Sequence, residues 1–148
     1  MHTRQDNIPM TQESHVDYLL NYLLNEGFSA IVDADGDITF KFEGLDYALC
    51  FDEDDADFAK IILPNIWQIK DQSELNQAMC MLDNVNRKMK VVKGYTTRDT
   101  VWFAAEVLFS ERTQLAIFIK RIIRALAHAG RIFAAGMLLD SESVITVA

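Results

Sequence analysis

The sequence predicts an α+β fold, a two-layer sandwich in which helices cover one face of a mainly antiparallel sheet. Three observations predict it. Apolar residues recur at helical spacing before Gly27, between Asp71 and Lys88, and after Ser110. The stretches between these helices alternate with the period of strands. Short turns rather than crossover helices join most of the strands, so the order α-βββ-α-ββ-α favours an antiparallel sheet.

The composition predicts one folded domain with an acidic first half. A length of 148 residues, half of them hydrophobic, is enough for a genuine core. We expect 1–148 to form a single domain, with 1–11 and 140–148 as flexible or peripheral ends. The net charge is −8, and the first 63 residues alone carry 14 acidic and 3 basic residues, or −11. Because such a surface repels nucleic acid and anionic lipid, we expect neither as a partner.

The first half of the chain predicts one helix and a run of strands. The helix begins at Thr11 or Gln12 and ends at Glu26, because Gly27 suits the left-handed position that follows a helix. Three strands follow, and an acidic loop leads to a further short strand that Pro64 stops. The ranges are 28–33, 38–42, 45–51 and 58–63.

The second helix begins near Gln72 and ends near Asn86 or Lys88. Asp71 and Glu74 have the spacing of a capping box at its start. After this helix the period changes, and two strands joined by a tight turn are predicted over residues 90–97 and 100–109.

The strand at 100–109 is apolar on both faces. One face is expected to meet the helices, together with residues of the earlier strands: Val101, Phe103, Ala105, Val107 and Phe109 with Phe40, Phe42, Leu49 and Phe51. The other face carries Trp102, Ala104, Glu106 and Leu108, of which Glu106 alone is charged. A strand with water on one side normally has polar residues there, so we expect a cover for this second face.

A second copy of the chain is the first candidate for that cover. Trp102 and Leu108 are expected in a homodimer interface, with Ile66, Trp67 and Ile69 from the connector after the fourth strand. In the alternative arrangement this connector folds over the same face within one chain. Both tryptophans can also be read as core residues, as large aromatic residues in small proteins usually are.

The sequence predicts no catalytic residue, cofactor or metal ligand. The histidines lie apart, and there is no nucleophile elbow and no phosphate-binding glycine loop. The acidic string at 33–37 fails as a calcium loop, since Ile31 and Phe42 would take the first and twelfth ligand positions, so we expect a hairpin turn. Cys50 and Cys80 have no pairing or zinc spacing and are expected to be buried free thiols.

The last helix can be capped by Ser110 and ends near Ala129 or continues, kinked, to Leu138. Four of its residues share one face: Arg121, Arg124, His128 and Arg131. A phosphate site and a solvent face opposite acidic residues are the two interpretations, and the net charge favours the second. Basic residues also interrupt the apolar run at 115–139, so we expect no membrane span and a cytoplasmic location.

The pattern resembles the YbjN-like family of small bacterial proteins, described as proposed sensory transduction regulators, whose fold is similar to that of type III secretion chaperones. The segments that carry the resemblance are YLLNEGF (Tyr22–Phe28), DGDITFKFEG (Asp35–Gly44), DNVNRKMKVVK (Asp83–Lys93) and the long strand into the final helix. It covers roughly Asp17 to Met137. The resemblance implies a non-enzymatic homodimer that binds another protein or an extended peptide. An enzyme with an unrecognised active site is the alternative.

Overall fold

The structure, a computed structural model, describes residues 12–146. Its elements, in chain order, are α1 (Gln12–Asn25), β1 (Ile31–Val32), β2 (Ile38–Phe42), β3 (Leu45–Asp52), β4 (Asp55–Gln68), α2 (Gln72–Lys88), β5 (Val92–Thr97), β6 (Thr100–Leu108) and α3 (Arg112–Thr146). The predicted flexible segment 1–11 lies outside the described residues, as do residues 147–148.

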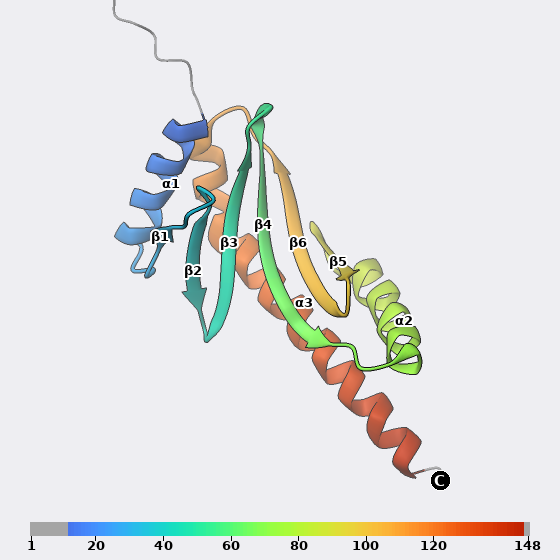
Figure 1. Ribbon diagram of the computed structural model, residues 1–148. Coiled ribbons are helices and arrows are strands. Elements are labelled where there is room, and N and C mark those ends of the chain that lie inside the picture. Colours follow the sequence, from blue (N-terminus) through green and yellow to red (C-terminus); the bar gives the residue numbers. More distant parts are fainter. Residues whose placement is uncertain (1–11, 147–148) are drawn as a thin grey trace, which may run out of the picture.

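The strands form a single six-stranded sheet in the order β1-β2-β3-β4-β6-β5, and all neighbouring pairs are antiparallel. Figure 1 shows α3 running diagonally behind this sheet, with α1 and α2 at its flanks and no helix in front. The predicted α+β fold with a mainly antiparallel sheet is therefore confirmed. We call the face without helices the open face.

The core lies between the sheet and α3. Every residue of the predicted inward set is buried except Val107 and Phe42, which are half-buried. Val107 lies near the end of β6, beyond the last residue that pairs with β5. The opposite side of the core comes from α3, whose fully buried side chains include Leu115, Ile119, Ile123, Leu126 and Phe133.

Local signals set the ends of α1 and α2 as the sequence predicts. At the end of α1, Gly27 has φ of 90°, and the N–H groups of Gly27 and Phe28 bond to Leu24 and Leu23 carbonyls. At the start of α2, the Asp71 carboxylate accepts a 2.8 Å hydrogen bond from the backbone N–H of Glu74.

The fourth strand differs from the prediction. β4 runs for 14 residues and continues through Pro64, because the chain bulges there instead of stopping. Leu63 pairs with Phe103 and Trp67 with Val101, so β4 has two extra residues at this point. Asn65, within the bulge, has φ of 55°. The acidic loop shrinks to a tight turn, since β3 ends at Asp52 and β4 begins at Asp55.

The last helix is also different: α3 continues to Thr146, beyond both predicted ends. The helix continues through both of its glycines, and at each of them a side chain of another element packs close to the helix backbone. Gly136 lies against the Met81 side chain of α2, and Gly130 lies beside Leu63 and Ile66 of β4. At its start, the Gln114 side chain accepts hydrogen bonds from Ser110 and Glu111 N–H groups. Ser110 is thus a donor to this cap rather than the predicted acceptor.

One stretch of α3, Arg112–Leu139, is long and apolar enough to cross a membrane by length and composition. Core helices of folded domains pass the same test. In this structure the apolar side of the helix packs against the sheet.

Candidate protein-binding surfaces

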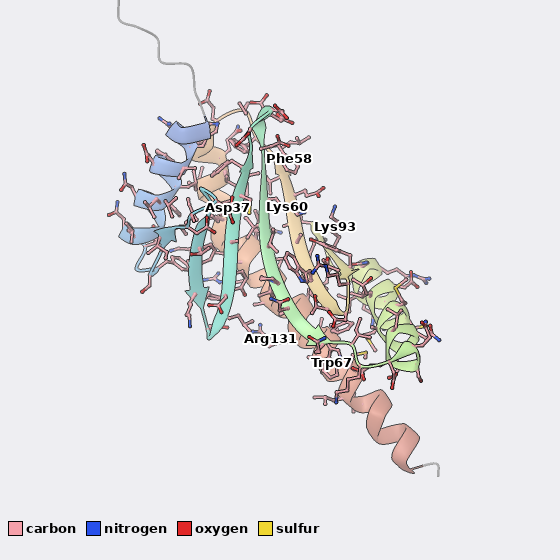
Figure 2. All side chains as sticks on the ribbon, in the orientation of Figure 1. Asp37, Phe58, Lys60, Trp67, Lys93 and Arg131 are labelled. Atoms are coloured by element: carbon pink, nitrogen blue, oxygen red, sulfur yellow. The ribbon has the colours of Figure 1, made fainter. Side chains whose placement is uncertain are left out.

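The open face of the sheet is the first candidate surface. Residues directly opposite each other on neighbouring strands point the same way, so the register assigns its members. Phe58 pairs with Leu108, Ile62 pairs with Ala104, and Tyr95 pairs with Trp102. Figure 2 labels Phe58 and Lys60 on β4 and Lys93 on β5, on the side of the sheet that no helix covers.

Charged and aromatic side chains cover the middle of this face. Lys93 donates a 2.6 Å hydrogen bond to Glu106, and the Lys60 ammonium lies 5.7 Å from the centre of the Tyr95 ring. Beneath them Ala104 is fully buried. The Lys93 contact lowers the pKa of the Glu106 carboxyl below its ordinary value. The apolar exposure predicted for the whole strand is therefore concentrated near its ends.

Leu108 is the most exposed large apolar side chain of the described residues, with 78% of its surface accessible. Trp102, at the other end of the strand, is half-buried, and its indole N–H donates to the Thr100 hydroxyl at 3.0 Å. An apolar side chain of this size gains roughly 1.5–3 kcal/mol when buried. Leu108 is thus the strongest attachment point on this face.

The five residues predicted for one interface lie on two opposite faces. Trp67 pairs with Val101 and therefore faces the helices, where its ring packs 6.2 Å from that of Phe133 in an edge-on arrangement. Ile69 is buried and Ile66 lies against α3. The predicted joint patch of Ile66, Trp67 and Ile69 with Trp102 and Leu108 does not form within the chain. The alternative in which this connector covers the open face is also wrong.

A groove beside the end of β6 is the second candidate surface. It has a volume of about 650 Å³ and lies between the chain after α2, the end of β6 and the part of α3 from Phe118 to Ala125. Its apolar lining is formed by Met89, Val91, Val107, Leu108, Phe118, Ile122 and Ala125. No single stretch of the sequence marks this groove, because three separate segments build it. Leu108, which belongs to both surfaces, is the one member that strand alternation singles out.

His15 and Cys50 are side chains of the kinds that serve in catalysis. His15 is buried between the Phe51 and Phe109 rings, with its Nε2 3.0 Å from the Ala56 carbonyl oxygen. Burial, and then the charge of Asp37, raise the pKa of the Cys50 thiol to about 12. Such a thiol stays protonated at neutral pH and is a weak nucleophile.

The cysteines depart from the prediction of two buried thiols. Cys50 is half-buried on the open side of β3, and Cys80 is exposed on α2. The buried positions of α2 are Ala78, Leu82 and Val85, which leaves Cys80 outside the apolar stripe.

The acidic string after β1 forms a turn, as predicted. The Asp33 carboxylate accepts hydrogen bonds from the N–H groups of Asp35 and Asp37, at 2.9 and 3.0 Å, and Gly36 has φ of 85°. Carboxylate oxygens of the three aspartates lie within 4.8 Å of one another, near enough to share a cation. The two hydrogen bonds within the turn already account for the position of the Asp33 carboxylate, so the cluster by itself does not define a metal site.

The basic residues of α3 meet acidic residues of the first half of the chain. Arg131 lies 3.4 Å from the Glu43 carboxylate in the β2–β3 turn, and Lys120 pairs with Glu26 at the end of α1. Of the four residues of the predicted basic face, Arg131 is thus opposite an acidic residue, as the solvent-face interpretation expects.

The fold and these surfaces define a small α+β module with an open sheet face and an apolar groove at the end of one strand. No family model matches the chain, and no curated protein matches it. Among solved structures, the chain is similar to YbjN from E. coli, which is described as a candidate transcription regulator. The TM-score is 0.61 at 14% identity, over 81% of this chain and 89% of YbjN. The chain therefore has a YbjN-like fold.

Proposed function

We propose that this protein is a non-enzymatic regulatory module of the cytoplasm that acts by binding protein and forms a homodimer through its open sheet face. The exposed Leu108, on a strand whose outward residues also include Trp102, is the observation on which the dimer rests. Around a two-fold axis each residue of this face contributes once from each subunit, so one interface can cover the Leu108 and Trp102 side chains of both subunits.

The regulatory part of the proposal draws support from the fold. YbjN, which shares it, is described as a candidate transcription regulator. A net charge of −8 disfavours direct contact with nucleic acid, so regulation through a protein partner is the better match to this chain. The two free thiols are in keeping with the reducing conditions of the cytoplasm.

Sedimentation analysis tests the dimer. The wild type is expected to sediment as a dimer at micromolar concentration, and Trp102→Glu and Leu108→Glu are expected to shift it towards monomer. Ile117→Glu is the matched control, because Ile117 is 71% exposed but lies on α3, away from the open face. A wild type that stays monomeric at hundreds of micromolar would refute the dimer.

A further inference from the structure

The groove beside β6 has an open strand edge in its wall. The pairing between β5 and β6 ends at Val92 and Ala105, so Glu106–Leu108 extend past β5. In the described part of the chain no strand pairs with β6 on that side beyond Ala105. Val91, just before β5, has φ of 71°, a conformation rare for a β-branched residue. An edge of this kind is a template for one more strand.

Apolar side chains surround this edge. Phe118 on α3 is 52% exposed and Val91 is 65% exposed, although both line the groove. Val107 and Leu108 point to opposite faces of β6. An added strand would therefore place alternate side chains between β6 and α3, on the side of Val107 and Phe118. A segment with apolar residues at every second position matches that arrangement.

The charges around the groove indicate which residues should lie between the apolar residues of the bound segment. Lys88, Lys90 and Arg121 line it, and Glu106 is the single acidic residue among its described lining residues. The Glu106 carboxylate is already bonded to Lys93 at 2.6 Å. The groove thus has an excess of positive charge in a chain of net charge −8. Complementarity calls for an acidic partner.

We propose that this groove binds an extended segment of a partner protein in which acidic residues alternate with apolar ones, added as a strand to the edge of β6 at Glu106–Leu108. The proposal rests on the proposed function, since it takes the module to be a protein-binding one. It names the chemistry of the partner and a surface separate from the Trp102 end of the open face.

Fluorescence anisotropy with labelled peptides of about six residues, the usual length of a strand, tests this. A capped peptide that alternates aspartate and valine is expected to bind, and one that alternates lysine and valine is expected not to. Lys90→Glu should weaken binding of the aspartate peptide about fivefold or more, as loss and reversal of one exposed charge contact implies. Lys70→Glu, at an exposed site outside the groove, should leave it unchanged.

A second pair of variants tests the apolar wall. Phe118→Asp should abolish binding of the aspartate peptide, whereas Ile117→Asp, at its exposed neighbour, should not. Equal binding of the aspartate and lysine peptides, or unchanged affinity in Phe118→Asp, would overturn the proposal. Trp102→Glu separates this site from the dimer: loss of the dimer with retained peptide affinity supports a distinct groove. A wild-type dimer that binds neither peptide refutes the groove and leaves the proposed dimer intact.

Discussion

The indole N–H of Trp67 donates a 2.6 Å hydrogen bond to the Glu74 carboxylate, and this contact joins the end of β4 to the first turn of α2. It helps to hold the half-buried Trp67 on the helix side of the sheet, although the sequence predicts an interface residue at this position. The ring packs against Phe133, and its polar atom has a charged acceptor, so both ends of the half-buried side chain have partners within the chain. It also engages the Glu74 side chain, which a capping box would direct back to Asp71.

Removal of this acceptor should destabilise the fold. Glu74→Ala is expected to lower the free energy of unfolding by about 1–2 kcal/mol, because a partly buried N–H loses a charged acceptor. Glu74→Gln should retain most of the stability, since its amide oxygen can still accept. Urea denaturation followed by tryptophan fluorescence measures both. Glu53→Ala, at an exposed turn, is the control, and an equal loss in the two alanine variants would contradict the assignment.

Gly94 is a second sensitive position, because β5 approaches α2 there. A Cβ at Gly94 would lie 2.5 Å from Leu82 Cδ2 and 2.5 Å from Phe103 Cε1. Gly94→Ala should therefore lower the free energy of unfolding by about 1–3 kcal/mol through overpacking. The added cost should shrink on a Leu82→Ala background, where space is available. Strictly additive effects in a chemical-denaturation cycle would mean that the two residues are not in contact.

The two cysteines should react at very different rates. Cys80 is exposed and should be modified rapidly by a thiol reagent at neutral pH, whereas burial and Asp37 hold the pKa of Cys50 at about 12. Mass spectrometry of the native protein should show one fast label, which Cys80→Ser removes. Asp37→Asn should accelerate modification of Cys50, because the neighbouring negative charge disappears. A Cys50 that labels as fast as Cys80 in the folded protein would contradict the structure.

Asp37 should also make stability depend on pH. Burial, and then the neighbouring Asp33 carboxylate, raise the pKa of Asp37 above its ordinary value of 3.8. The pKa of Asp37 is thus higher in the folded chain than in the unfolded chain, where it is close to 3.8. At a pH between the two values the folded chain still holds the proton and the unfolded chain has released it. The contribution of Asp37 to the free energy of unfolding therefore falls as pH rises. Below pH 3.8 Asp37 is protonated in both states, so its ionisation does not lower the free energy of unfolding.

Asp37→Asn removes that ionisation and is the corresponding test. Relative to wild type, the variant should gain stability as pH rises from below 3.8 to neutral, with the gain developed across the window between the two pKa values. Thermal unfolding at a series of pH values measures it. The control, Asp54→Asn, removes a charge from an exposed turn. A gain of the same size at every pH would show that ionisation of Asp37 is not its cause.

The fold class can be predicted from local chemistry in the sequence. Gly27 and Asp71 end one helix and begin another, and the alternation of Val101, Phe103 and Ala105 fixes which side of β6 is buried. A shift of one residue would turn these side chains to the open face and bring the charged Glu106 to the helix side, so the cost of burying its carboxylate disfavours the other register.

The positions of the connector and of the binding surfaces, in contrast, depend on contacts between distant elements. The two extra residues of β4 after Leu63 let Ile66 lie against α3. Trp67, which alternation from Leu63 already directs to the helix side, is held there by its hydrogen bond to Glu74. The groove forms only when the end of β6 meets α3 and the chain leaving α2. Periodicity describes one element at a time. A bulge that changes register, or a groove built by three distant segments, depends on contacts between elements that no local pattern contains.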